Sequence, residues 1–146
     1  MFKHILISTD GSALSIKAAK AGIALAKALG AKVTAYCAIE LMPAVYMDGV
    51  AFDERALDAI ESGARQVGQQ RVDAIEKLCK AARVPFASVI TKVNTPYEGI
   101  INAAKKQKCD VIFMASHGRR GIAKLVMGSV TQKVLTHTRI PVVVYR

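Results

Sequence analysis

The stretch DVIFMASHGRRGIAKLVMGSV, residues 110–130, decides the fold because it joins an apolar strand to a glycine-rich turn and a helix start. Its first part, residues 110–115, is a short apolar run of the kind that is buried on both faces of a parallel sheet. Three glycines follow, and residues 129–136 then carry apolar side chains at helical spacing. A strand covered on both faces needs helices above and below it, which predicts an α/β protein.

The rest of the chain alternates in the same way between strand-like and helix-like patterns. These patterns predict strands at residues 3–9, 32–39, 85–93, 110–115 and 141–145, and helices at residues 13–29, 53–82, 96 to about 106, and 129–136. Ser12 and Gly30 mark the ends of the first helix, and Thr95-Pro96-Tyr97-Glu98 is a capping box that opens the third. Gly63 and Gly68 weaken the long second helix, where a break is one expectation.

This alternation predicts a doubly wound α/β domain with a five-stranded, mostly parallel sheet and helices on both faces. The 146 residues suit a single domain spanning residues 1–146, and 52% hydrophobic residues supply a core, which excludes a disordered basic tail. No apolar run approaches the roughly 20 residues that span a bilayer. The chain enters its first strand without a leader-like segment, so we expect no membrane association and a cytoplasmic location.

The three cysteines, Cys37, Cys79 and Cys109, are widely spaced within apolar segments. There is no CxxC pair, and no Cys/His cluster has metal-ligand spacing. We therefore expect reduced, buried thiols and no metal site.

The formal net charge of +10 raises the question of a nucleic-acid partner. Residues 40–76 are net acidic, and the basic excess lies mainly in residues 77–146. Trp is absent, and the tyrosines of the basic half are only Tyr97 and Tyr145, whereas single-strand binders interleave aromatic and basic residues. This pattern disfavours a nucleic-acid partner, whose signature would be a steep loss of affinity with salt.

Glycines beside a helix start suit a bound anion, because the backbone can approach phosphate oxygens and free N–H groups point toward them. A P-loop is excluded, since it needs Gly-Lys-Ser/Thr where Gly128 is followed by Ser129-Val130. A dinucleotide fingerprint is also excluded, since only Gly11 follows the first strand. The basic residues inside the loop are candidates for contact with a triphosphate: Arg119, Arg120 and Lys124.

The chain resembles the universal stress protein family, in its single-domain, ATP-binding type. That family has a glycine, two residues, a glycine, nine residues and then Gly-Ser/Thr after the fourth strand. Here Gly118, nine residues and Gly128-Ser129 match, while Ala115 stands at the first glycine. The opening ILISTD, the segment Ser116-His117-Gly118 and the ending PVVV also match, so the resemblance covers essentially the whole chain.

The resemblance implies strand order 3-2-1-4-5, an adenine nucleotide α-hydrolase-like fold, and ATP, with or without Mg²⁺, at the carboxyl ends of strands one and four. Asp10 would face the base and ribose, and Ala38 and Met114 would line the adenine pocket. Ribose and phosphates would be held by the loop residues Ala115, Gly118, Gly128, Ser129 and Val130. The alanine at position 115 would crowd the nucleotide if the backbone there approached it closely or needed a positive φ.

We expect a nucleotide-dependent stress-response switch or sensor and not an enzyme. Ser116 and His117 are adjacent on a tight loop, where side chains rarely point at each other, so we predict no nucleophile–base pair. Asp10 is the only carboxylate expected near the site, so any hydrolysis should be slow or depend on a partner. His4 and His137 have no evident partners and are interpreted as structural.

The final strand, Val142–Tyr145, is predicted to be an exposed edge with apolar residues on both faces. Pairing two copies through it would satisfy its backbone groups, and the family's usual homodimer does this. Two alternatives to the ATP switch stay open at this point. One is a nucleotide-free dimeric interaction module of the same fold, and the other is a hydrolase of the wider adenine nucleotide group.

Overall fold

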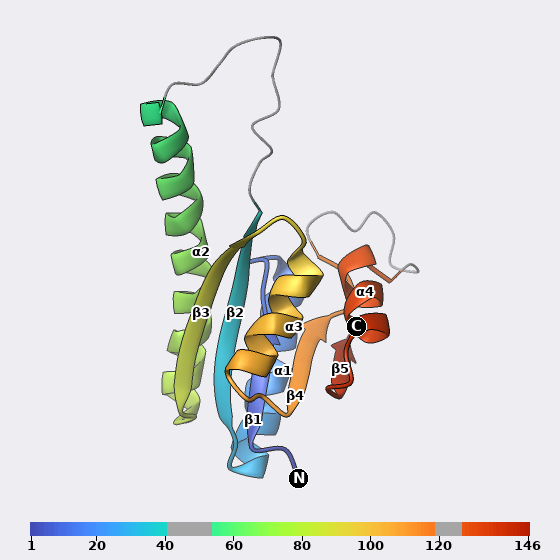
Figure 1. The fold of residues 1–146 in the computed structure, drawn as a ribbon. Helices are drawn as coiled ribbons and strands as arrows, with labels where there is room; N and C mark the ends of the chain where they lie inside the picture. Colours follow the sequence, from blue (N-terminus) through green and yellow to red (C-terminus); the bar gives the residue numbers. More distant parts are fainter. Residues whose placement is uncertain (41–53, 119–126) are drawn as a thin grey trace.

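A computed structural model describes residues 1–40, 54–118 and 127–146 (Figure 1). The elements, in chain order, are β1 (His4–Ser8), α1 (Ala13–Leu29), β2 (Lys32–Glu40), α2 (Glu54–Ala82), β3 (Phe86–Val93), α3 (Pro96–Lys106), β4 (Val111–Ala115), α4 (Ser129–His137) and β5 (Val142–Tyr145). The strands form one parallel sheet in the order β3-β2-β1-β4-β5. The fold class and strand order are therefore confirmed.

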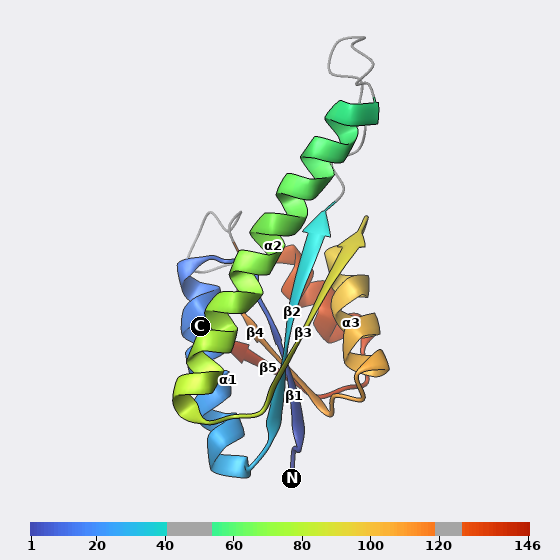
Figure 2. The same cartoon turned by 90° about the vertical axis from the view of Figure 1, so that its left-hand side faces the viewer.

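Helices cover both faces of this sheet, with α1 and α2 on one face and α3 and α4 on the other (Figures 1 and 2). Alternation along β1 explains the two cores. Ile5 and Ile7 pack into the cluster that includes α1 and α2, while Leu6 packs into the opposite cluster with Ile100 of α3 and Val134 of α4. A strand that is buried on both faces has an uninterrupted run of apolar residues, which is what the sequence of β1 contains.

The first helix begins and ends at the predicted residues. The Ser12 hydroxyl accepts a hydrogen bond from the backbone N–H of Ser15 at 3.1 Å, which caps the helix. Gly30 ends it in the left-handed region at φ 63°, a conformation that suits glycine.

The second helix is continuous from Glu54 to Ala82, so the expected break at its glycines is wrong within these residues. Gly68 is buried, and a Cβ atom there would lie only 3.2–3.3 Å from side-chain atoms of Ile39 and Ile90. The glycine lets α2 approach β2 and β3 closely, which offsets its low helix propensity.

One predicted helix cap differs in detail. Thr95 makes no side-chain bond to the α3 backbone, and its hydroxyl instead donates to Glu98 Oε2 at 2.5 Å. The capping-box prediction failed here because a hydroxyl can satisfy a nearby carboxylate as well as a backbone N–H. The N-cap of α4 is Gly128.

The two histidines interpreted as having no partner both have one. His4 Nε2 lies 2.7 Å from the Thr34 hydroxyl on β2, and burial lowers the pKa of His4. His137 Nδ1 lies 2.8 Å from the backbone oxygen of Lys133, and the His137 ring contacts the Tyr97 ring at a tilt of 52°, with 5.0 Å between the centroids. The His4–Thr34 contact joins β1 to β2 and the His137–Tyr97 contact joins α4 to α3, which agrees with structural roles.

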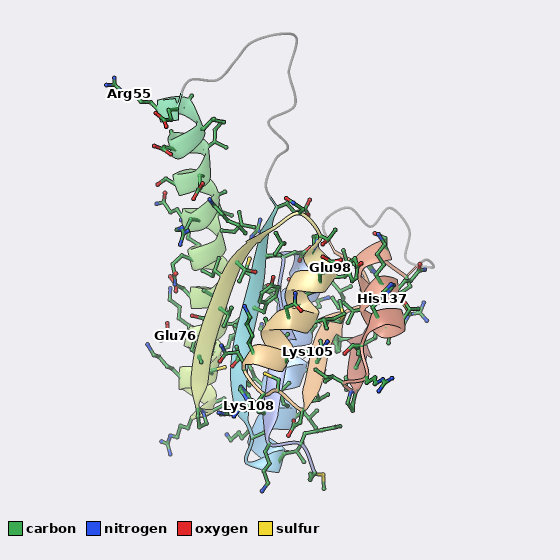
Figure 3. All side chains as sticks on the ribbon, in the orientation of Figure 1. Arg55, Glu76, Glu98, Lys105, Lys108 and His137 are labelled. Atoms are coloured by element: carbon green, nitrogen blue, oxygen red, sulfur yellow. The ribbon has the colours of Figure 1, made fainter. Side chains whose placement is uncertain are left out.

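Several of the basic residues gather at the end of the molecule where the strands begin. Lys27, Lys80, Lys105 and Lys106 lie in the last turns of α1, α2 and α3, and Figure 3 shows Lys105 and Lys108 far from Arg55 at the opposite end. Cations at helix C-termini interact favourably with the helix dipole. This part of the positive charge therefore stabilises helix ends.

Within the described residues, no helix has the length and apolar character needed to cross a membrane.

Candidate functional site

The carboxyl ends of β1, β2 and β4 open onto a cleft of about 770 Å³. Strand order reverses at this place, because β1 continues through α1 to β2 on one side while β4 pairs with it on the other. Ligands of open α/β sheets bind at such a switch point, and the volume is in the usual range for small-molecule sites. The cleft brings together all eight predicted site residues: Asp10, Ala38, Met114, Ala115, Gly118, Gly128, Ser129 and Val130.

One side of the cleft is an apolar wall that belongs to the α3–α4 face of the sheet. Ala38, Ile100, Met114 and Val130 belong to the hydrophobic cluster on that face, and Pro96 adds the first residue of α3. These side chains offer a flat apolar object a place to pack and give it few polar groups to contact. A purine base is flat and has apolar faces, so it fits such a wall.

The turn after β1 holds Asp10 in a fixed position. Asp10 Oδ1 accepts a hydrogen bond from the Ser12 N–H at 3.0 Å, and the Thr9 hydroxyl accepts one from the Gly11 N–H at 3.1 Å. Gly11 has φ +78°, where other residues are strained. The carboxylate is therefore oriented by its own backbone before any ligand arrives.

Hydrogen bonds join the residues on either side of the loop after β4 to each other and to the ends of β4 and β5. The Gly128 N–H donates to the backbone oxygen of Ser116 at 2.8 Å, and the Ser116 N–H donates to Tyr145 at 2.7 Å. The Thr131 hydroxyl donates to the Ala115 oxygen at 3.0 Å. The start of α4 has no side-chain cap, so its first N–H groups are available to an anion.

Ala115 occupies the end of β4 without strain. Its φ lies outside the left-handed region, so the backbone at this position makes no demand for glycine. Ala115 belongs to the same cluster as Ile7 and Phe113, and the residue is 8% exposed. One of the two objections to alanine at this position is thus removed.

Ser116 and His117 do contact each other, contrary to the prediction. The Ser116 hydroxyl lies 3.1 Å from His117 Nδ1, and Ser116 is buried while His117 lines the cleft. The prediction failed because the chain turns directly after β4, which brings the two side chains to one side. Three candidate phosphate contacts, Arg119, Arg120 and Lys124, lie outside the described residues.

Two charged residues of the cleft were missed by the sequence analysis. Glu40 lines it from the end of β2, so the prediction that Asp10 is the only nearby carboxylate is wrong. Arg71 lines it from α2. One indication of this role is present in the sequence: Arg71 occupies a position of α2 at which the helical spacing of apolar residues predicts a core residue.

Within residues 1–40, 54–118 and 127–146, no three His, Cys, Asp or Glu side chains are grouped so as to hold a metal ion.

The model of the universal stress protein family matches residues 1–146. The chain belongs to the universal stress protein family. Two relatives in that family align with all of it. A universal stress protein of Thermus aquaticus is 33% identical over 150 residues and is itself fully covered. The universal stress protein MJ0531 of Methanocaldococcus jannaschii is 29% identical over 146 residues, which cover 83% of that protein.

Solved structures share the fold of this universal stress protein. Protein MJ0577 superimposes with a TM-score of 0.84 at 24% identity, over 99% of this chain and 95% of that one. A universal stress protein in complex with cAMP gives 0.73 at 18% identity over 99% and 97% of the two chains. A family protein from Arabidopsis thaliana with AMP bound gives 0.68 at 12% identity over 97% and 90%. At these identities the likeness establishes the fold.

Proposed function

We propose that the cleft binds ATP, with or without Mg²⁺, and that the protein is a nucleotide-dependent switch or sensor of a cytoplasmic stress response. The observation that carries this proposal is the convergence of four separate segments on one cleft. The turn after β1, the end of β2, the end of β4 with the turn that follows it, and the start of α4 supply the eight predicted residues, which are among those that line it. Complexes of two family proteins with cAMP and AMP support an adenine nucleotide as the ligand.

Each part of the nucleotide has a matching part of the cleft. The base packs on Ala38 and Met114, and Asp10 accepts hydrogen bonds from base or ribose. The phosphates lie along Gly118 and Gly128 toward the uncapped N–H groups at the start of α4, where the helix dipole favours an anion. Ser129, which is exposed, offers its hydroxyl to the same phosphates.

A switch is favoured over a fast enzyme. The Ser116–His117 pair lacks a third side chain that orients the histidine among the hydrogen bonds of the described residues, whereas an activated nucleophile usually has one. We therefore propose that binding, and not turnover, is the functional event. Hydrolysis at a rate that survives repeated purification would favour the hydrolase alternative.

Isothermal titration calorimetry with ATP, in the presence and absence of Mg²⁺, tests the proposal. Saturable binding of one ATP per chain below millimolar concentration is expected, and adenosine alone should compete weakly. Absence of saturable binding up to millimolar ATP would leave the nucleotide-free interaction module as the function of this chain.

We also propose a homodimer that forms through β5. This strand is at the edge of the sheet, and all of its residues, Val142–Tyr145, are only half-buried in the single chain. An edge strand with apolar side chains exposes unpaired backbone groups, which a second copy would satisfy. Size-exclusion chromatography with light scattering should give twice the chain mass. A species of 15.6 kDa at micromolar concentration would contradict it.

A further inference from the structure

Arg71 lies on the side of the cleft away from the apolar wall. It comes from α2, on the face of the sheet that α1 and α2 cover, and it lines the cleft together with Ser15, Ala64 and Val67 of the same two helices. The start of α4 belongs to the opposite face, where Val130 packs. The cleft thus extends across the carboxyl ends of the strands. The cationic side chain of Arg71 lies on one side of it, and the uncapped N–H groups of α4 lie on the other.

The Arg71 side chain is held in place by close packing on the turn after β1. A Cβ atom on Gly11 would lie 3.0 Å from both Cγ and Nε of Arg71, so the glycine leaves the space that the arginine fills. Nη1 points to the Cys37 sulfur at 3.8 Å, which is a weak acceptor. The stem of the side chain is therefore fixed, while most of its five N–H donors are not engaged by this contact.

A half-buried guanidinium usually pairs with a carboxylate, because removing a charge from water is costly unless it is compensated. None of the ion pairs within residues 1–40, 54–118 and 127–146 includes Arg71. The first turn of α1, which begins at Ala13 after the N-cap Ser12, contains no acidic residue. The guanidinium and the positive end of the α1 dipole thus lie on the same side of the cleft and attract an anion there, although the carboxylates of Asp10 and Glu40, which also line the cleft, oppose this attraction in part.

In the pose proposed above, the 5′-phosphate chain uses only the α4 side of the cleft. If the phosphates lie at the start of α4 and the base lies on Ala38 and Met114, the ribose is left between Asp10 and the α1–α2 side. A second phosphate on the ribose would then face the guanidinium, whose planar fork suits phosphate oxygens.

We propose that Arg71 forms a second anion subsite and that the cleft takes adenine nucleotides carrying a 2′- or 3′-phosphate on the ribose in addition to the 5′-phosphate. This inference rests on the proposed nucleotide site and deepens it. AMP and ATP then occupy the site without using Arg71, and ribose-phosphorylated nucleotides occupy it more completely.

Calorimetric titration with three probes tests the subsite: AMP, adenosine 3′,5′-bisphosphate and adenosine 2′,5′-bisphosphate. For the wild-type chain, at least one bisphosphate should bind ten-fold or more tightly than AMP. In Arg71→Met, whose unbranched side chain still covers Gly11, that bisphosphate should bind no more tightly than AMP, while AMP affinity changes less than two-fold. Arg65→Met is the matched control, because Arg65 is exposed on the same helix, pairs with Glu61 and does not line the cleft.

The outcomes separate the two proposals. If AMP binds but neither bisphosphate binds more tightly, the subsite is overturned and the nucleotide site stands. The same holds if Arg71→Met weakens AMP as much as the bisphosphate while its circular dichroism and melting temperature match those of Arg65→Met. If neither AMP nor ATP binds the wild-type chain, the nucleotide site is overturned and the subsite with it.

Discussion

The carboxylate of Asp10 lies directly against the backbone of Gly118, so the turn after β1 touches the loop after β4 across the switch point of the sheet. A Cβ atom on Gly118 would overlap Asp10 Oδ2, well inside van der Waals contact. Gly118 has no positive φ, so its glycine is required by space and not by conformation. The position of one residue at the floor of the cleft is thus set by the absence of a side chain on the other.

Gly118→Ala should weaken ATP binding by about ten-fold, which corresponds to about 1.4 kcal/mol. The added methyl group displaces the Asp10 carboxylate from its place in the cleft, while the exposed loop tolerates the extra atom. Calorimetry measures the affinity, and thermal melting shows that the fold is retained. Gly63→Ala is the control: a Cβ atom there meets nothing within 4 Å, so the variant should bind ATP normally and gain up to about 1 kcal/mol of helix stability. Unchanged ATP affinity in Gly118→Ala would remove the Asp10–Gly118 contact from the site.

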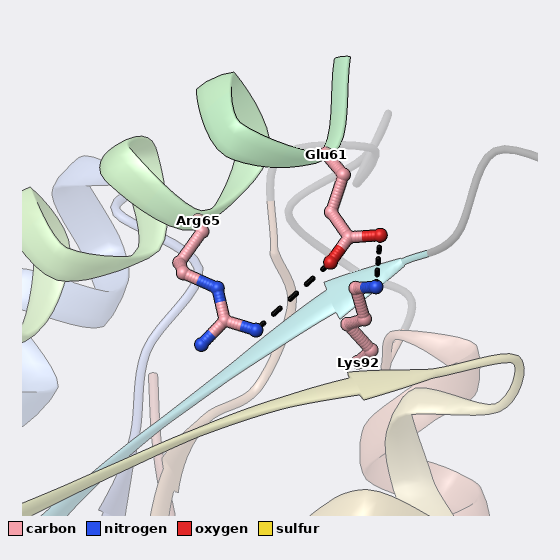
Figure 4. Close-up of polar contacts among 3 residues, drawn as sticks. All are labelled: Glu61, Arg65 and Lys92. Carbon is pink, nitrogen blue, oxygen red and sulfur yellow. Dashed lines mark ion pairs between the residues drawn. The ribbon is translucent and has the colours of Figure 1, made fainter. Parts of the chain in front are cut away.

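Lys92→Gln should lower the free energy of unfolding by about 0.5 kcal/mol. Lys92 on β3 pairs with Glu61 on α2, and Arg65 lies 4.0 Å from the same carboxylate (Figure 4). The pair ties α2 to β3, but both side chains are substantially exposed, so solvent and salt screen it. Urea unfolding measures the effect, which should disappear in 1 M NaCl. Lys20→Gln, on the exposed side of α1, should change stability by less, and an equal loss in both variants would show that only general charge is involved.

The free energy of unfolding should fall as the pH rises from about 9 toward 11. Burial raises the pKa of the Cys79 and Cys109 thiols to about 11 each. The unfolded chain releases these protons near the ordinary thiol value while the folded chain keeps them, so their contribution is complete below pH 9 and is lost above it. Urea unfolding at successive pH values should give a shallower decline for the double variant Cys79→Ala/Cys109→Ala. Equal slopes in the two proteins would contradict the prediction, whatever the absolute loss from the cavities.

The fold was predictable because its signals are local and agree with one another. The caps of α1, the proline that opens α3 and the apolar strands each predicted the element that the structure contains. The order of the strands is not local information. It came from the resemblance of the Gly118–Gly128 spacing to a family pattern, and the sheet confirms it.

The polar details of the cleft were less predictable, because they depend on which segments meet in space. Nothing in the spacing of α2 shows that Arg71 reaches Gly11, some sixty positions earlier in the sequence. The side-chain bond from Thr95 to Glu98 and the Ser116–His117 contact depend on rotamers that the sequence does not determine. Residue types thus indicated where the cleft lies. They did not indicate that the charged side chains of Glu40 and Arg71 line it, because that depends on the three-dimensional fold.

Ala115→Gly should destabilise the protein by about 1–2 kcal/mol and change ATP affinity by less than two-fold. The buried methyl group contributes about 0.8 kcal/mol, and glycine in a strand costs roughly 0.5–1 kcal/mol in backbone entropy. No gain in binding is expected from a more permissive backbone, because Ala115 does not adopt a positive φ, and its methyl packs toward Ile7 and Phe113. Ala87→Gly on β3 is the control for entropy alone, since Ala87 is exposed in its strand, and it should lose only the backbone part. Urea unfolding and calorimetry measure the two quantities. A ten-fold rise in ATP affinity for Ala115→Gly would instead mean that the methyl group crowds the nucleotide. The alanine would then lower ATP affinity while it improves packing at the end of β4.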